Sequence, residues 1–319
     1  MDLWLEQILA NSQPQLFDAV RPKNGADESI FRSVYPACSQ FNQHSLKLPP
    51  QQFATNLWNW WLPLAMVIVE YRTRQSQPLI QGILAAQGTG KTTLAEILKL
   101  ILGEMGYQTI CLSLDDLYKT YSDRLILKQQ DPRLIWRGPP GTHDLDLGID
   151  VLDALHQPNS DTIIQLPRFD KSAYNGAGER GAFEAVSRAD IVLFEGWFVG
   201  VRPIESAVFD TAPPPIISQS DRQFARDMNA KLQDYLPLWE RIDKLILLYP
   251  LDYRWSLQWR KQAEHQASAL GKSGMNDLEI EQFVNYFWRS LHPELFVKPS
   301  NWVDLVIEIK SDRSWGKVY

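Results

Sequence analysis

The segment at residues 85–93 constrains the fold of this chain more than any other part of the sequence. Its Gly-Lys-Thr at positions 90–92 matches the end of the pattern G-x-x-x-x-G-K-[ST], and Ala85 stands where the pattern has its first Gly. A short apolar run precedes the segment, and apolar residues at helical spacing follow it: Leu94, Ile97, Leu98, Ile101 and Leu102. A strand, a Gly-containing turn and a helix in this order predict a nest of backbone N–H groups at a helix N-terminus, which is a phosphate-binding loop.

The pattern assigns separate tasks to the residues of this loop. Gly88 and Gly90 let the backbone turn its N–H groups inward, so Ala85 is a mild departure. Lys91 is expected to reach the β- and γ-phosphates of a nucleotide, and the Thr92 hydroxyl to ligate Mg²⁺. The alternative is a Gly-rich turn that binds nothing. The nucleotide-binding residues predicted from the loop are Gly88, Thr89, Gly90, Lys91, Thr92 and Thr93.

Composition argues against several classes of protein. With 32 basic and 38 acidic residues and a net charge of −6, the chain lacks the basic footprint of a nucleic-acid-binding protein. Two isolated cysteines, Cys38 and Cys111, argue against a disulfide framework and for a reducing compartment. The longest apolar stretch, residues 57–69, is too short to span a bilayer and predicts a buried helix. Residues 1–6 carry acids early and form neither a signal nor a transit peptide, so a cytoplasmic protein is expected.

Several short apolar runs follow the loop and are separated by helical or polar segments. Runs of this kind predict strands that are buried on both faces, and their alternation with helices predicts an α/β fold with a doubly wound, mainly parallel sheet. We interpret residues 1–77 as a helical N-terminal extension and residues 78–319 as the domain that contains the phosphate loop. Ligands of such sheets bind beyond the carboxyl ends of the strands. The runs are residues 109–114, 162–166, 191–194, 245–249 and 305–309.

Acidic residues follow two of these runs. Asp115 and Asp116 come after the first, where one carboxylate can accept a proton from a substrate hydroxyl and the other can help to hold Mg²⁺. Glu195 ends the third run, as the acid of a Walker B strand does, and is a candidate metal ligand together with Thr92. The alternatives are an acidic pair that caps the next helix, and a strand-end Glu that pairs with a surface Lys.

Two polar loops, at residues 137–144 and 166–180, contain basic groups among Gly and Pro. Together these groups are suited to capture a small anion such as a carboxylate. Each residue taken singly can instead be a solvated loop charge, and His143 can be a structural histidine. A further segment, residues 249–262, predicts a helix whose basic residues can close over bound phosphates as a lid, or can form a solvated face.

These motifs, in their order along the chain, resemble a known group of proteins. The segments at 90–93, 113–118, 167–170 and 192–196 are similar to those of P-loop kinases of the phosphoribulokinase, uridine kinase and pantothenate kinase group. Within that group, the segments at 137–144 and 169–180, with Phe-Glu-Gly-Trp at 194–197, resemble the D-glycerate 3-kinases of plants and cyanobacteria and related fungal kinases. The resemblance covers roughly residues 80 to 310.

The resemblance implies an enzyme that transfers a phosphoryl group from ATP, with Mg²⁺, to the 3-hydroxyl of D-glycerate. It implies that Lys91 and Asp115 are the catalytic residues, with Asp115 as the general base, and that Arg260 is the arginine of the lid. The remaining site residues are expected to bind the glycerate carboxylate and 2-hydroxyl. They are Asp116, Arg137, His143, Asp144, Arg168, Lys171 and Arg180.

Three functions are therefore compatible with the sequence. The first is the phosphorylation of D-glycerate, with small molecules as the only expected partners and neither nucleic acid nor membrane involved. The second is a related small-molecule kinase that acts on a nucleoside, pantothenate or a sugar phosphate. The third is a regulatory ATPase, which would not need the acceptor-activating acid at position 115 or the two cationic loops.

Overall fold

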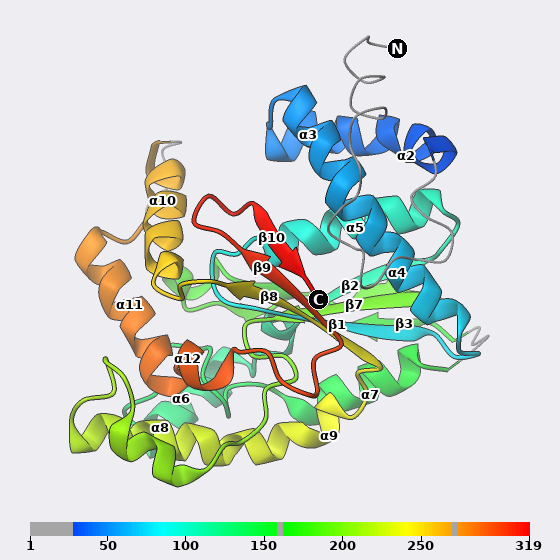
Figure 1. Cartoon of the computed structure of the whole chain (residues 1–319). Coiled ribbons are helices and arrows are strands. Elements are labelled where there is room, and N and C mark those ends of the chain that lie inside the picture. The colour runs from blue at the N-terminus through cyan, green and yellow to red at the C-terminus, as the bar shows by residue number, and fades with distance from the viewer. Residues whose placement is uncertain (1–27, 158–161, 270–273) are drawn as a thin grey trace.

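A six-stranded sheet forms the centre of the protein in the computed structural model, which describes residues 28–157, 162–269 and 274–319 (Figure 1). The strand order is β10-β9-β8-β1-β7-β2, and every neighbouring pair is parallel except β9 and β10. The predicted α/β fold with a mainly parallel sheet is confirmed. The strands of this sheet are β1 (Leu79–Ala85), β2 (Thr109–Ser113), β7 (Ile191–Gly196), β8 (Lys244–Pro250), β9 (Leu305–Ile309) and β10 (Trp315–Val318).

Helices cover both faces of the sheet. On one side lie α2 (Glu28–Phe41), α3 (Pro50–Asn56), α4 (Leu62–Thr73) and α5 (Lys91–Glu104), together with the π-helical turns η2 (Asn42–Leu46) and η3 (Leu57–Trp61). On the other side lie α7 (Leu145–Leu155), α8 (Gln219–Lys231), α9 (Leu236–Trp239) and α12 (Pro293–Phe296). The remaining helices are α6 (Tyr121–Gln130), α10 (Trp255–Ala269) and α11 (Asp277–Ser290), with short 3₁₀ turns η4 (Leu114–Leu117), η5 (Tyr174–Gly176), η6 (Ser206–Thr211) and η7 (Leu232–Tyr235).

The central strand β1 shows why the sheet needs both layers. Every residue of β1 is buried. Ile80 and Leu84 face the layer that contains α7 and α8, whereas Leu79 and Ile83 face the layer of α2 to α5. Because successive side chains of a strand point to opposite faces, a strand with apolar side chains on both faces is stable only between two apolar layers.

The helix after the phosphate loop agrees with its prediction. All five residues of the predicted apolar stripe are buried in α5. The apolar stretch at 57–69 is helical too, although it begins as the π-helical turn η3 before α4. Helices α2 to α4 share one apolar cluster with the sheet, and the predicted boundary at residues 77–78 lies between α4 and β1 and stays a prediction. The predicted structure of residues 1–27 lies outside the described residues.

One predicted strand belongs elsewhere. Residues 162–166 were expected to join the parallel sheet, but β3 (Ile164–Leu166) pairs antiparallel with β6 (Glu184–Val186) in a separate two-stranded sheet. The apolar run is too short to distinguish a central strand from a hairpin arm, since Gln165 between two buried residues is exposed. A second small hairpin, β4 (Phe169–Asp170) and β5 (Glu179–Arg180), encloses the polar loop between them.

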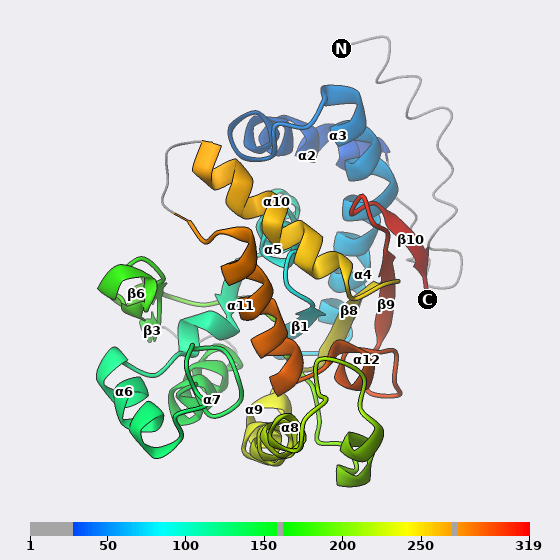
Figure 2. The ribbon, with the colours of Figure 1, turned by 90° about the vertical axis from the view of Figure 1, so that its left-hand side faces the viewer.

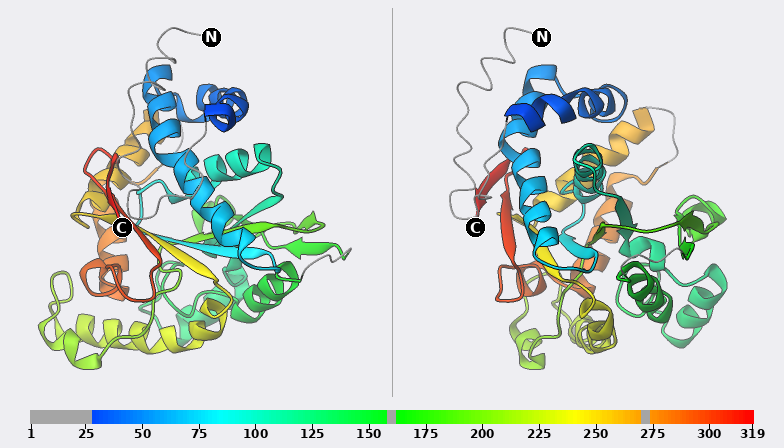
Figure 3. Two further views of the ribbon diagram at one scale, coloured as in Figure 1. Left: turned by 45° about the vertical axis from the view of Figure 1, so that its right-hand side comes forward. Right: turned by 90° about the vertical axis from the view of Figure 1, so that its right-hand side faces the viewer.

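The carboxyl ends of the parallel strands meet at one edge of the sheet. Figure 2 looks toward this edge, which α10 and α11 cross. The two views in Figure 3 show the C-terminal β9–β10 hairpin, in red, beside the N-terminal helices, in blue. Within the described ranges, no helix is both long enough and apolar enough to cross a membrane.

Candidate active site

The phosphate loop connects β1 to α5 at the carboxyl edge of the sheet. Gly88 and Gly90 have φ angles of 78° and 90°, which favour glycine, and Gly90 is the residue that precedes α5. The Thr89 hydroxyl donates a hydrogen bond to the Ala86 carbonyl at 2.8 Å, which closes the turn. Ala85 is the buried last residue of β1 and belongs to the apolar cluster that β1 shares with α2 to α5. The geometry is that of an anion-binding helix N-terminus.

The close approach of Trp259 also requires a glycine at position 88. A Cβ at this position would lie 2.8 Å from the Cβ of Trp259 in α10. Arg313, in the turn between β9 and β10, donates to the Gly88 carbonyl at 3.0 Å and lies over the Trp259 ring. The loop is therefore held between α10 and the C-terminal hairpin.

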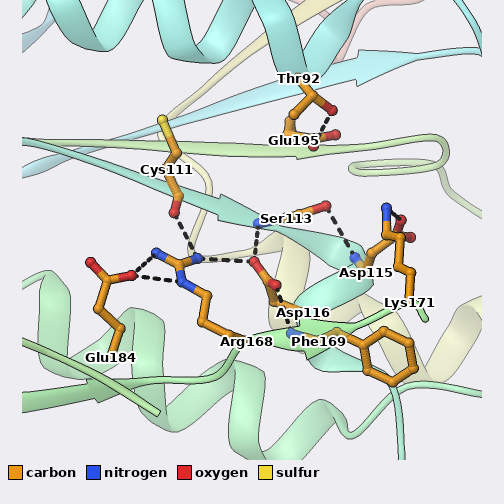
Figure 4. A network of polar contacts seen from close by, with 10 residues as sticks. All are labelled: Thr92, Cys111, Ser113, Asp115, Asp116, Arg168, Phe169, Lys171, Glu184 and Glu195. Atoms are coloured by element: carbon orange, nitrogen blue, oxygen red, sulfur yellow. Dashed lines mark hydrogen bonds and ion pairs between the residues drawn. The ribbon is translucent and has the colours of Figure 1, made fainter. Parts of the chain in front are cut away.

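Thr92 and Glu195 form the candidate metal site. The Thr92 hydroxyl donates to Glu195 Oε1 at 2.9 Å (Figure 4), and Glu195 is almost fully buried. Its other oxygen, Oε2, is buried without a hydrogen-bond partner, although a buried carboxylate oxygen normally has one. Mg²⁺ needs one or two protein oxygens beside phosphates and water, so this pair fits that ion even though the described residues contain no larger cluster of metal ligands. The alternative of a strand-end Glu paired with a surface Lys does not apply, since its partner is Thr92.

Asp115 lies next to this pair, on the neighbouring strand end. In the register of β2 and β7, Ser113 lies opposite Glu195, and Asp115 follows two residues later in η4. Its Oδ2 is 2.6 Å from Lys171 Nζ (Figure 4). Burial alone would raise the pKa of Asp115, but the charge and hydrogen bond of Lys171, the charge of Lys91 and a hydrogen bond from Tyr118 outweigh it and lower the pKa below its usual value. The carboxylate is therefore ionised at neutral pH and can accept a proton.

Asp116 has a different task from its neighbour. It forms a capping box with Ser113, whose backbone N–H donates to Oδ2 at 3.0 Å. Oδ2 also accepts from Arg168 Nη1 at 3.0 Å, and Oδ1 accepts from the Phe169 backbone at 3.2 Å (Figure 4). Arg168 in turn binds Glu184 and the Cys111 carbonyl. The helix-capping alternative thus describes Asp116, and the prediction that Asp116 and Arg168 bind substrate stays untested while their polar atoms hold the loop in place.

The predicted substrate-binding residues of the loop at 137–144 likewise differ from one another in their roles. His143 is buried, its Nδ1 is 2.7 Å from the Tyr235 hydroxyl, and its ring stacks on Tyr118 at 4.6 Å. Burial lowers its pKa to about 3, so the imidazole is neutral. Asp144 caps α7 and forms an ion pair with Arg180 at 2.8 Å. Their predicted substrate contacts remain predictions, and in this structure these three residues support the wall behind Tyr118.

Arg137 does face the site, and it has a companion that the sequence did not single out. Arg137 donates to the carbonyls of Gly176 and Ala177 at 2.6 and 3.0 Å. Arg124, in α6, donates to the Ala177 carbonyl at 2.7 Å and to the Gly178 carbonyl. Among the described residues, neither guanidinium forms an ion pair with a carboxylate. A lone Arg in a polar helix gives no signal in the sequence, because its environment comes from a loop more than fifty residues away.

Both arginines lie over the same aromatic group. Their guanidinium carbons lie 5.2 Å (Arg124) and 5.3 Å (Arg137) from the centre of the Phe169 ring, and Arg137 also lies 5.8 Å from that of Tyr118. Tyr118 thus contacts Arg137 through its ring and Asp115 through its hydroxyl. Two of the three carbonyls that the arginines bind belong to glycines with left-handed backbone, Gly176 and Gly178, whereas Ala177 between them is right-handed.

Arg260 lies in α10, as the lid interpretation expects, and lines the same cavity. It pairs with Glu264 one turn along the helix and lies over the Phe283 ring at 5.3 Å. The other basic residues of this segment point elsewhere, since Arg254 pairs with Asp252 and Lys261 with Glu281.

One cavity of about 1470 Å³ joins these groups. Its lining includes the phosphate loop, Asp115, Lys171, Arg124, Arg137 and Arg260. Pockets for one small ligand typically measure about 300–1,000 Å³, so this cavity has room for two substrates. Its chemistry combines a phosphate-binding end with an end that has one ionised carboxylate among three cations.

Comparisons with known proteins agree with this geometry. No protein-family model matches the chain. An uncharacterized kinase of Schizosaccharomyces pombe is 34% identical over 221 residues, which are 67% of this chain and 79% of that protein. The chloroplastic D-glycerate 3-kinase of Arabidopsis thaliana is 28% identical over 302 residues, which are 87% of this chain and 64%, under two thirds, of that protein.

A solved structure extends the similarity to three dimensions. The D-glycerate 3-kinase from Cryptococcus neoformans superposes with a TM-score of 0.72 at 29% identity, which covers 81% of this chain and 98% of that one. Sequence similarity, fold and phosphate loop lead to one conclusion. The chain belongs to the family of P-loop kinases that includes the D-glycerate 3-kinases.

Proposed function

We propose that this kinase transfers the γ-phosphoryl group of ATP to the 3-hydroxyl of D-glycerate, which gives 3-phosphoglycerate and ADP. The observation that carries the proposal is the acceptor end of the cavity, where Asp115 is accompanied by Lys171 and by two arginines that have no acidic partner among the described residues. An acceptor that suits this end has a hydroxyl for the acid and a carboxylate for the cations. The relatives named as D-glycerate 3-kinases support the same acceptor.

The donor end binds and orients the phosphates. The backbone N–H groups at the start of α5 and the ammonium of Lys91 would hold the β- and γ-phosphates. Thr92 and Glu195 would hold Mg²⁺, whose charge offsets that of the phosphates when it is bound. Arg260, from α10, would approach the same phosphates from the opposite side.

The residues at the acceptor end would supply the general base and bind the carboxylate of the substrate. The Asp115 carboxylate would accept the proton of the 3-hydroxyl as the hydroxyl oxygen attacks the γ-phosphorus and ADP leaves. Arg137 and Arg124 would bind the carboxylate of the substrate, since guanidinium groups match carboxylates in geometry as well as charge. Tyr118 links the two positions and fixes their separation, which selects the hydroxyl at the far end of a short hydroxy acid.

A panel of acceptors tests the proposal. Turnover with ATP is measured by ADP release for D-glycerate, L-glycerate, glycerol, uridine and pantothenate. We expect D-glycerate to give the highest kcat/KM. Glycerol, in which a hydroxymethyl group replaces the carboxylate, should be at least about a hundredfold lower, because the loss of charged hydrogen bonds at a built site costs several kcal/mol. Higher turnover of uridine or pantothenate would assign the chain to another acceptor, and ATP hydrolysis unaffected by every acceptor would assign it to a regulatory class.

A further inference from the structure

The cavity continues past the phosphate loop to a wall that lies away from the acceptor. There it is lined by residues of η2, α3 and η3 and by the turn between β9 and β10. Figures 2 and 3 show these N-terminal helices close to the C-terminal hairpin. In the strand order, β2, which leads to Asp115, is at one edge of the sheet, and β9 and β10 are at the other edge. Strand β1, which leads to the phosphate loop, lies between them. A nucleotide whose terminal phosphate faces Asp115 must therefore direct its base toward this wall.

The wall is apolar and aromatic. Leu46 and Leu48 line it from the N-terminal segment, and Leu94 and Ile97 line it from α5. The wall also contains two indole rings: Trp60 of η3 and Trp315 of β10 have their ring centres 5.3 Å apart. Aromatic side chains of this kind bind nucleobases by stacking.

Two amide side chains add hydrogen-bonding groups to this wall. Gln52 and Asn56 lie one turn apart on α3, and both line the cavity. In the part of the chain that the structure describes, neither amide forms a hydrogen bond with another protein group. An amide offers a donor and an acceptor side by side, which matches the paired donor and acceptor on the edge of a base.

The wall is held in place by hydrogen bonds on both sides. The Asn42 amide donates to the Leu48 carbonyl at 2.9 Å and accepts from the Leu48 backbone at 3.0 Å. Arg313 binds the Gly88 carbonyl and, on α10, the side chain of Gln262 at 2.9 Å. The first pair of bonds orders the N-terminal segment internally, Arg313 joins the hairpin to the phosphate loop, and the Trp60–Trp315 contact joins the hairpin to the N-terminal segment. A wall that is ordered before the ligand arrives reduces the cost of binding.

We infer that the N-terminal helices form the base-binding part of the donor site, with the base stacked on the apolar wall and its edge bound by Gln52 and Asn56. This inference rests on the proposed function only in taking a nucleoside triphosphate as the phosphoryl donor. It gives the segment before the phosphate loop a direct part in substrate binding.

Calorimetric titration of the full chain separates the base from the phosphates. The variant Gln52→Ala/Asn56→Ala is titrated with ADP and with inorganic pyrophosphate, which has no base. We expect ADP to bind at least about fivefold more weakly and pyrophosphate to bind as it does to the unmodified protein, because only hydrogen bonds to the base are lost. The matched control is Gln51→Ala, an exposed Gln on the same helix outside the cavity, which should leave both affinities unchanged.

Three results would overturn the inference. They are unchanged ADP affinity in the double variant, an equal loss of ADP and pyrophosphate affinity, and an equal effect of the control. Because no acceptor is present, these titrations give the same answer whether or not D-glycerate is the substrate. Failure of the acceptor assignment is therefore distinguishable from failure of this inference.

Discussion

Replacement of Asp115 by Asn tests the proposed base with little change in shape. The amide oxygen can still accept hydrogen bonds from Lys171 and Tyr118, but it cannot take a proton. Loss of general-base help typically lowers kcat by about 10²–10⁴, which is about 2.7 to 5.4 kcal/mol of barrier at 1.36 kcal/mol per tenfold change. We expect kcat with D-glycerate to fall within this range, while ADP affinity changes little because the phosphate loop is intact.

The assay is steady-state turnover, followed by calorimetric titration with ADP. Asp150→Asn is a matched control, because Asp150 is exposed on α7 and outside the cavity, and it should turn over normally. A fall in kcat of less than about tenfold for Asp115→Asn would refute the assignment of this carboxylate as the base.

Three other perturbations follow from the same geometry. Lys171→Met removes a charge that holds the pKa of Asp115 down while the burial that raises it remains, so the acidic limb of kcat/KM should move to higher pH, and an unmoved limb would count against the pairing. His143 has a pKa of about 3 in the folded state against 6.5 for the free side chain, so stability should fall as pH drops from 6.5 toward 3. In His143→Gln, the slope of the unfolding free energy between about pH 4 and 6 should be shallower by about 1.4 kcal/mol per pH unit in denaturant titrations. Gly88→Ala puts a Cβ 2.8 Å from an α10 side chain at a positive φ and should weaken ADP binding about tenfold or more, whereas Gly106→Ala, with similar φ and open space, should not.

Much of the fold was predictable because its signals are local. The phosphate loop, the buried stripe of α5 and four of the five strand runs after it depend on patterns within ten to fifteen residues. The run at 162–166 failed because a short apolar run does not specify its partner strand. The antiparallel β10 was not predicted, since its partly exposed Trp-Gly-Lys-Val sequence is not a continuous apolar run.

The candidate site was predictable in its residue types but less so in its division of tasks. Neighbouring aspartates look alike in sequence, yet Asp116 is used in a capping box and an ion pair whereas Asp115 faces the cavity. Arg124 is positioned by carbonyls of a loop that is distant in the sequence. Gln52 and Asn56 line the cavity because the N-terminal helices lie beside the C-terminal hairpin, which their local sequence does not indicate. Such assignments depend on long-range contacts that no local pattern encodes.

The identity of the product distinguishes phosphorylation of the D-glycerate 3-hydroxyl from the alternative reactions. The protein is incubated with ATP, Mg²⁺ and D-glycerate, and the phosphorylated product is identified by ³¹P nuclear magnetic resonance. We expect 3-phosphoglycerate, formed in equal amount to ADP and with no 2-phosphoglycerate. Formation of the 2-phosphate, or ADP release without a phosphorylated glycerate, would contradict it.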